Sequence, residues 1–364
     1  MVRKVNKTKI IALNARFLLF LHLKKKIMNK IFTFIRTWKL PVAMFTGVLL
    51  YYIFGAIIPE DSDKEFYYAI SHILQPTLIF SMLFLSFLKV EPKNLKPHRW
   101  HGILLLTQGS LFVLCSLAAL YLPTSINEKI LWEGAMLCFI CPTATAAAVI
   151  VQKLGGSLSG VVTYIVLCNL LVSALAPGFL TLVEPHSGLD FLTELFMIMG
   201  KVFPLLLCPL FVALIVRHYA PKFKDRMLQI KDLAFYLWLV ALALAITVTV
   251  RTIVESDIAL SILLGLAAIS AVCCVIQFTL GRAIGKRWQQ PTKPKSECKN
   301  KGEYIDPIER SAITAGQAFG QKNTVFIIWM GLVFLNPVTS VVGGFYSIWH
   351  NLVNSYQLYK KGKR

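Results

Sequence analysis

Long apolar stretches recur along this chain, and they constrain its fold more than any other feature. A helix crosses the hydrocarbon of a bilayer once with about 20 apolar residues. Of the 364 residues, 56% are hydrophobic and only 15% are charged, too few charges for the surface of a soluble protein of this size. We therefore predict an all-α membrane protein with ten spans, at 40–58, 67–88, 102–122, 131–152, 157–183, 195–216, 233–253, 259–281, 311–334 and 338–357.

The positive charges gather in alternate loops. The formal net charge is +20, and 33 of the 38 Lys and Arg residues lie in 1–39, 89–101, 153, 217–232, 282–310 and 360–364. The opposite loops carry Glu60, Asp61, Asp63, Glu65, Glu184, Asp190, Glu194, Glu255 and Asp257. This bias predicts two cytoplasmic termini in a multi-pass plasma-membrane protein, or inner-membrane protein in a bacterium, whose bases contact anionic lipids. We expect no nucleic-acid partner.

Outside the spans, the chain offers one tail and one long loop. Residues 1–39 carry eleven bases and no acid, and they lack the cleavage pattern of a signal peptide, so we expect a cytoplasmic tail. Met28 is an alternative start to Met1. Residues 40–358 then form a single transporter domain, with a solvated cytoplasmic loop at 285–310.

Cysteine usage gives no disulfide framework. Seven of the eight cysteines fall inside predicted spans. Cys138 and Cys141 form a CxxC pair, but no second pair or histidine cluster accompanies it. We interpret them as small residues on one helix face, and we expect neither a metal nor a resident cofactor.

The spans divide into two sets of five, at about 40–183 and 195–358. The fourth span of each set carries a polar run that disturbs a helix, "CPTATAAAV" at 141–149 and "TAGQAFGQKNT" at 314–324. Five crossings are an odd number, so the second set must be inverted in the membrane. Inverted repeats with paired interrupted helices indicate the binding site of a secondary transporter.

The two polar runs supply the candidate binding groups. Pro142 removes a helix hydrogen bond, and the freed carbonyl groups need a partner because lipid offers none. The second run weakens its helix with glycine and adds amide, hydroxyl and ammonium groups. The candidate substrate or ion ligands from the two runs are Pro142, Thr143, Thr145, Gln317, Gly320, Gln321, Lys322, Asn323 and Thr324.

Lys322 is the most unusual of these residues. It lies about eleven residues from either end of its span, so roughly 16 Å of helix separates it from each surface. A charge at that depth costs at least about 2.5 kcal/mol. The interior of the spans, away from their ends, holds no acid, so the ammonium group has backbone carbonyls, neutral amides or an incoming anion as partners. It is either a structural lysine tied to carbonyls or part of the transport site.

Other polar residues in the spans are more ambiguous. Gln108 and Asn169 are amides in spans 3 and 5, and each suits a clamp between helices or a ligand. His72 is better explained as a packed polar residue than as a metal ligand. Lys201 and Arg251 lie near span ends, where their side chains can reach the interface.

Three stretches of this chain together resemble a known family. "CPTATAAAVIVQKLGGS", "GQKNT" and "YSIWHNLVNS" (346–355) look like motifs of the bile acid:sodium symporter superfamily, over about residues 38–358. The resemblance implies two inverted five-helix repeats, split into a panel and a core, with discontinuous helices 4 and 9 that cross. It also implies sodium ions behind the crossing and an organic anion between the two parts. Residues 142–149 and 320–324 would form the crossing, and Gln108 would stand close to a sodium-binding glutamine.

The chain departs from that pattern at the sodium ligands. The serine and asparagine of the family's helix 4 align with Ala147 and Ala148, and the glutamate and glutamine of its helix 9 align with Ala318 and Lys322. The Lys322 ammonium group could therefore stand as a built-in cation where sodium otherwise sits. It could instead load and release a proton in each cycle, because burial disfavours the charged form.

We predict a secondary transporter of a small organic solute, with an anion as the expected substrate, coupled to sodium, to protons or to neither. An arsenite or metalloid efflux carrier is an alternative, although that related branch has its thiol after the helix-4 proline and Cys141 precedes it here. A transport-inactive receptor is a second alternative, since decay would also remove sodium ligands. No carboxylate pair, HExxH or Ser/His pair supports an enzyme.

Overall fold

The computed structural model describes residues 39–89, 91–185, 188–230, 233–256, 258–289 and 306–362. The predicted tail, except Lys39, and most of the predicted loop at 285–310, including Cys298, lie outside the described residues. Within them every regular element is helical, and the one β-type pairing is an isolated antiparallel bridge between Thr143 and Lys322. The predicted all-α class is confirmed for the described part of the chain.

The helices follow the predicted spans closely. The first half contains α2 (Lys39–Ile57), α3 (Glu60–Ala69), the π-helical turn η1 (Ile70–Leu74), α4 (Gln75–Lys89), η2 (Pro92–Asn94), α5 (Arg99–Tyr121), α6 (Ile126–Ile140), α7 (Ala146–Leu154) and α8 (Leu158–Val183). The second half contains α9 (Phe191–Tyr219), α10 (Pro221–Gln229), α11 (Leu233–Glu255), α12 (Leu260–Arg287), α13 (Pro307–Gly320), α14 (Thr324–Phe334), η5 (Pro337–Ser340) and α15 (Val341–Gly362).

Six helical stretches in the described residues are long and apolar enough to cross a membrane, and two shorter helices are also apolar. The six are Ser62–Lys89, Arg99–Tyr121, Leu158–Val183, Phe191–Tyr219, Leu233–Glu255 and Leu260–Arg287, and the shorter two are Pro41–Ile57 and Thr324–Phe334. The protein is thus a multi-pass membrane protein by helix composition. Two predicted spans are each divided into a pair of shorter helices, and α15 carries several polar residues, so the full number of ten crossings remains a prediction.

The second predicted span begins earlier than we expected. Four acidic residues that were predicted to lie in a loop, Glu60, Asp61, Asp63 and Glu65, belong to α3. Acidic side chains are favourable there because the amino end of a helix carries a partial positive charge. The helix then widens into the π-helical turn η1 just before Pro76, whose missing N–H disturbs the regular hydrogen-bond ladder.

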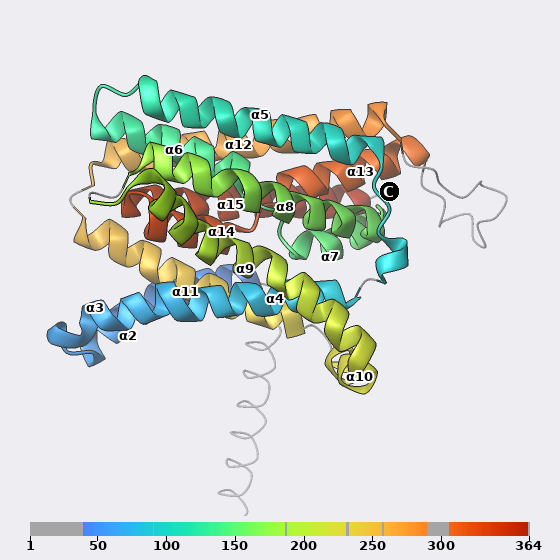
Figure 1. Cartoon of the computed structure of the whole chain (residues 1–364), viewed down its shortest axis with the longest axis horizontal. Coiled ribbons are helices and arrows are strands. Elements are labelled where there is room, and N and C mark those ends of the chain that lie inside the picture. Colours follow the sequence, from blue (N-terminus) through green and yellow to red (C-terminus); the bar gives the residue numbers. More distant parts are fainter. Residues whose placement is uncertain are drawn as a thin grey trace, which may run out of the picture.

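The helices pack in two layers (Figure 1). We call α2, α4, α9 and α11 the panel, in which α2 packs on α11 and α4 packs on α9 and α11. We call α5–α8 and α12–α15 the core, where α12 packs on α13, α6 and α15. The four helices α6, α7, α13 and α14 meet inside the core. Most of the largest fully buried side chains belong to core helices.

Glycine residues allow α12 and α13 to pack unusually closely. A Cβ atom on Gly281 would lie 2.7 Å from the Ala315 carbonyl oxygen, and one on Gly320 would lie 2.4 Å from the Phe278 ring. Close backbone approach through small residues is typical of helix pairs in membranes. This seam fixes the end of α13, and therefore the position of the break that follows it.

Candidate functional site

The helix formed by α6 and α7 breaks where the sequence predicts. α6 ends at Ile140, Cys141 takes an extended conformation with φ −51° and ψ 133°, and α7 begins at Ala146. A residue before proline is restricted to such extended conformations, and the proline has no N–H to continue the helix. Pro142 thus causes the first break.

The second break separates α13 from α14. α13 ends at Gly320, Gln321 is extended, and α14 begins at Thr324. The Asn323 side chain caps α14, because its Oδ1 accepts a hydrogen bond from the Phe326 backbone N–H at 3.3 Å. Asparagine is a favoured residue at this capping position.

The two extended segments cross and pair with each other. The Ala144 N–H donates to the Gln321 carbonyl oxygen, and the Asn323 N–H donates to the Pro142 carbonyl oxygen, both at 2.9 Å. The Thr143 hydroxyl adds a bond to the Ala318 carbonyl oxygen. Backbone groups exposed by the two breaks therefore bind one another, which is how irregular backbone is tolerated at membrane depth.

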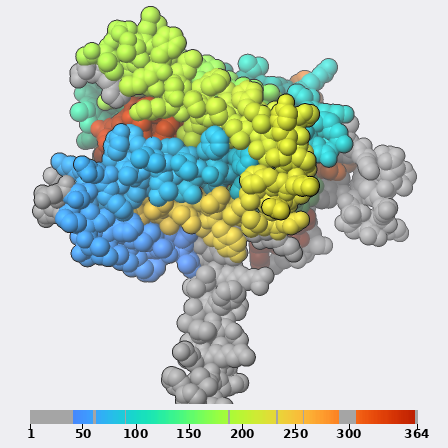
Figure 2. All heavy atoms as spheres, turned by 60° about the horizontal axis from the view of Figure 1, so that its bottom comes forward, coloured from blue at the N-terminus to red at the C-terminus, as the bar shows by residue number. Residues whose placement is uncertain are grey.

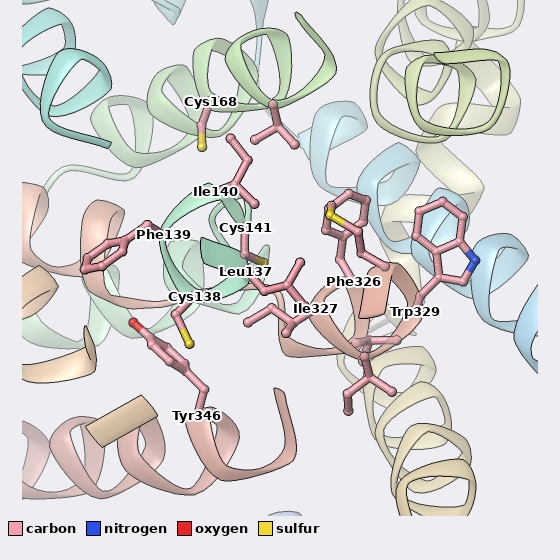
Figure 3. Packing of buried hydrophobic residues seen from close by; sticks show 14 of the residues in the cluster. Leu137, Cys138, Phe139, Ile140, Cys141, Cys168, Phe326, Ile327, Trp329 and Tyr346 are labelled. Atoms are coloured by element: carbon pink, nitrogen blue, oxygen red, sulfur yellow. The ribbon is translucent and has the colours of Figure 1, made fainter. Parts of the chain in front are cut away.

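Lys322 is completely buried at this crossing. Its Nζ donates to the Phe139 carbonyl oxygen at 3.4 Å and lies 5.1 Å from the centre of the Phe319 ring. Among the described residues no carboxylate lies within ion-pair distance of it, and the titratable groups that face it are thiols, those of Cys138, Cys141, Cys168 and Cys273. Figure 3 shows three of these thiols, on Cys138, Cys141 and Cys168, around the end of α6.

Side chains from α5, from α12 and from the segment between α13 and α14 cap the carbonyl end of α6. The Cys138 oxygen accepts from Gln277, the Phe139 oxygen from Lys322 and the Ile140 oxygen from Gln108, at 3.2, 3.4 and 3.1 Å. The last carbonyls of a helix have no partner inside it and carry a partial negative charge. Lys322 therefore contributes a positive group to a place that is favourable for a cation.

Two glutamine–tyrosine pairs flank the crossing, one in each half of the chain. In the first half the Tyr164 hydroxyl donates to Gln108 Oε1 at 2.8 Å. In the second half Gln277 Nε2 donates to the Tyr346 hydroxyl at 3.1 Å, and that hydroxyl donates to the Gly320 carbonyl oxygen at 2.8 Å. Gln108 was a predicted candidate, whereas Gln277, Tyr164 and the role of Tyr346 were not predicted. For Gln277 the available signal was an amide four residues before the end of the predicted span 259–281.

Replacing Tyr346 with phenylalanine is expected to lower the free energy of unfolding by about 2 kcal/mol. The buried Gly320 carbonyl oxygen loses its side-chain donor, and Gln277 Nε2 keeps only its bond to the Cys138 carbonyl oxygen. The midpoint of thermal unfolding of the purified protein measures this change. Tyr356→Phe, on the exposed side of the same helix, is the matched control and should behave like the parent protein. Equal midpoints for both variants would show that the hydroxyl does not hold the end of α13.

The remaining predicted ligands lie in different surroundings. Gln317 donates to Asn354 and Gln357 of α15, both at 3.0 Å, and Asn169 donates to the Leu206 carbonyl oxygen of α9 at 3.2 Å. Asn169 thus clamps the core to the panel. Thr145 is the residue before α7 and its side chain makes no capping bond. Buried oxygen atoms without a hydrogen-bond partner remain on Gln317, Gln321, Thr324 and Asn169.

One buried acid needs separate mention. Glu133, in the middle of α6, is 1% exposed, and its carboxylate accepts a bond from the Thr339 hydroxyl at 2.6 Å. It stands eight residues before the break, roughly 12 Å along the helix axis. Lys129, one turn earlier on α6, lies within 4.0 Å of it. Glu133 therefore has Thr339 and Lys129 as its partners, and it lies only two residues inside the predicted span 131–152. It does not serve as the counter-ion of Lys322.

Comparison with known proteins gives one family match. Residues 42–333 match the family model described as the SBF-like CPA transporter family. No curated protein matches the chain. The matched region runs from α2 to α14 and includes both segments of the crossing.

Proposed function

The chain belongs to the SBF-like CPA transporter family, which is related to the bile acid:sodium symporter superfamily, and we propose that it moves a small organic anion by alternating access with Lys322 as a built-in cation. The predicted relationship is thereby confirmed. Family membership implies a secondary transporter, and such families are typically non-enzymatic. Neither the substrate nor the coupling ion follows from membership.

The observation that carries the proposal is the Lys322 ammonium group among the carbonyls at the end of α6. Carbonyl oxygens at a helix end are the ligands that a hard cation such as sodium prefers, and the ammonium group occupies one of them. The neighbouring places where the resemblance implies sodium ligands hold buried methyl groups, on Ala147 and Ala318. A fixed positive charge would hold the crossing without a diffusible ion.

The packing of the helices supports two related repeats. If α2–α8 form one repeat and α9–α15 the other, equivalent helices make equivalent contacts. The matched pairs are α2 on α11 with α9 on α4, α5 on α6 with α12 on α13, α5 on α8 with α12 on α15, and α7 on α8 with α14 on α15. We propose that the second repeat is inverted, with both termini cytoplasmic, and that each broken pair counts as one of ten crossings.

Alternating access would then be a rocking of the panel against the core. In transporters built from repeats, substrates bind near the midplane where discontinuous helices meet. The crossing stays intact in this motion because its backbone groups bind one another. The solute would bind between the crossing and the panel, and membrane lipids would surround the outer faces of both layers.

Uptake into proteoliposomes that contain the purified full-length protein tests the proposal. A thermal-shift screen of organic acids, sterol conjugates and cofactor precursors first selects candidates, with and without sodium. We expect saturable uptake of an organic anion that continues when potassium replaces sodium. Uptake of arsenite alone would indicate the metalloid carrier, binding without uptake would indicate a receptor, and uptake that requires sodium would contradict the built-in cation.

A further inference from the structure

One face of α15 carries polar side chains deep inside the core. Ser347, His350 and Asn354 are 0%, 2% and 4% exposed, and their spacing of three and four residues places them on the same side of the helix. Gln357 continues this side to a half-buried position near the end of α15. We call these four residues the polar stripe. An ionisable residue inside a membrane protein, here His350, is by default a candidate functional group.

The polar stripe faces α13. Gln317 of α13 donates to both Asn354 and Gln357 at 3.0 Å. Tyr346, one turn before His350, bonds through its hydroxyl to the last residue of α13. The His350 ring lies between these contacts, with its centre 5.7 Å from that of the Tyr346 ring. The stripe therefore runs from the half-buried end of α15 to the crossing.

Buried groups without hydrogen-bond partners follow the stripe from one end to the other. Among the described residues they are His350 Nδ1 and Nε2, Ser347 Oγ, Asn354 Nδ2, Gln317 Oε1 and, beside Tyr346, Gln277 Oε1. A buried donor or acceptor without a partner destabilises the fold. Buried water commonly satisfies such groups where several of them converge.

The chemistry of these groups favours water and protons over an ion. A neutral imidazole offers one donor and one acceptor, a hydroxyl offers both, and the amide groups add one nitrogen donor and two oxygen acceptors. Donors and acceptors are thus balanced, as a chain of water molecules requires. Within the described ranges no group of three metal-binding side chains is present, which argues against a metal ion at the stripe.

No charged group of the described chain lies within electrostatic range of the His350 ring. The titratable groups that face its neighbour Tyr346 are thiols from α6, its end and α12, those of Cys138, Cys141, Cys273 and Cys274. On the helices packed around α15, Glu133 bonds to Thr339, and the other charged residues lie toward helix ends. The latter include Lys129 on α6, Lys153 on α7, Arg251 and Glu255 on α11, Arg282, Lys286 and Arg287 on α12, and Lys360 and Lys361 on α15 itself.

The stripe reaches the surface at the C-terminal end of α15. Lys361 there donates to the Lys153 carbonyl oxygen at the end of α7, at 2.8 Å. On the panel side the core is largely covered: Figure 2 shows α4 and α9, in blue and lime, with a red patch of the core between them. Under the proposed topology the C-terminal end of α15 faces the cytoplasm, so water would enter the stripe from that side.

We propose that the polar stripe is a hydrated path for protons from the cytoplasmic end of α15 to the crossing, with His350 as the residue that binds and passes on the proton. This inference rests on the proposed function, in which Lys322 is a fixed cation, and it names the proton as the coupling ion. The neutral imidazole accepts a proton from water at one nitrogen and then releases the proton of its other nitrogen, so that one proton moves along the path. Tyr346 and Gln277, which are bonded to each other, connect the path to the carbonyl end of α6.

Hydrogen–deuterium exchange at the histidine Cε1 atom, followed by mass spectrometry of the full-length protein in detergent, tests the path. This exchange requires a protonated ring and hydroxide from water. We expect His350 to exchange roughly tenfold faster than His101, which is also buried but has both ring nitrogens bonded, to the Gly160 carbonyl oxygen and the His98 N–H. His218, exposed on α9, gives the rate with full access to water. A rate at His350 equal to that at His101 would overturn the proposal.

A variant that makes the stripe apolar tests the route of the water. Asn354→Leu places an apolar side chain of similar shape in the stripe, and we expect it to slow exchange at His350 roughly fivefold without changing the rate at His218. Asn351→Leu is the matched control, because the Asn351 amide bonds to its own helix, at the Ser347 carbonyl oxygen. Gln357→Leu at the half-buried end serves if Asn354→Leu does not fold. Equal rates at His350 in the stripe variant and the control would show that water does not arrive by this route.

The coupling role is tested in the same proteoliposomes as transport. A proton gradient across the membrane should change the rate of uptake by the parent protein, and His350→Gln should remove this dependence, whereas Lys322→Gln should keep it in its residual uptake. Parent uptake that ignores the gradient would overturn the proton as coupling ion. Because the exchange measurement needs no flux, the path can pass its test when no uptake is found, and it can fail when uptake is observed.

Discussion

Replacing Lys322 with methionine is expected to leave the protein folded while lowering the rate of organic-anion uptake at least tenfold, about 1.4 kcal/mol in the activation free energy. Methionine nearly matches the length of the lysine side chain, but it supplies neither a charge nor a donor for the Phe139 carbonyl oxygen. Because a charge at this depth costs about 2.5 kcal/mol or more, its removal should keep or raise the midpoint of thermal unfolding. Such a loss of function without a loss of stability is the mark of a strained functional group.

A second variant, Lys322→Gln, distinguishes the two roles open to Lys322, a fixed cation and a proton carrier. For a fixed cation, the residual uptake of Lys322→Gln should rise when sodium is added, since sodium can then approach the carbonyl end of α6. For a proton carrier, the pH dependence of uptake in the parent protein should disappear in the variant, with no response to sodium. Lys222→Met removes an exposed charge from α10 and is the control. Parent-like uptake by Lys322→Met would remove Lys322 from the mechanism.

The breaks were predictable because their causes are local. Pro142 lacks an N–H and restricts the residue before it, so the end of α6 follows from the sequence alone. At the second break Gly320 and the polar residues that follow it weaken the helix, and Asn323 supplies a cap. The early start of α3 was missed because acidic residues indicate both a loop and the first turn of a helix.

The partners across the crossing were less accessible to sequence reasoning. Gln277 lies far from the end of α6 in the chain, and only the packing of α12 on α6 brings its amide to the Cys138 carbonyl oxygen. Asn169 left two roles open, and its bond to α9 identifies a clamp. The position of the Lys201 Nζ, 5.6 Å from the centre of the Phe334 ring, also depends on a tertiary contact that the local sequence does not indicate.

Replacing Gly281 with leucine is expected to lower the free energy of unfolding by about 3 kcal/mol or more, because the seam between α12 and α13 has no space for a side chain. Even a Cβ atom would lie 2.7 Å from the Ala315 carbonyl oxygen and 3.0 Å from the Gly316 Cα atom. Both neighbours are backbone atoms, so a change of rotamer cannot relieve the contact. The helices must separate, and α13 carries the crossing with it.

Gly102→Leu is the matched control, since a Cβ atom at Gly102 of α5 meets nothing within 4 Å. It should change the stability by no more than about 0.5 kcal/mol, as an exposed substitution does. The midpoint of thermal unfolding and the yield of monodisperse protein measure both variants in the same detergent. If Gly281→Leu is as stable as its control, the seam cannot be what holds α13, and the position of Lys322 must depend on the backbone pairing of the crossing alone.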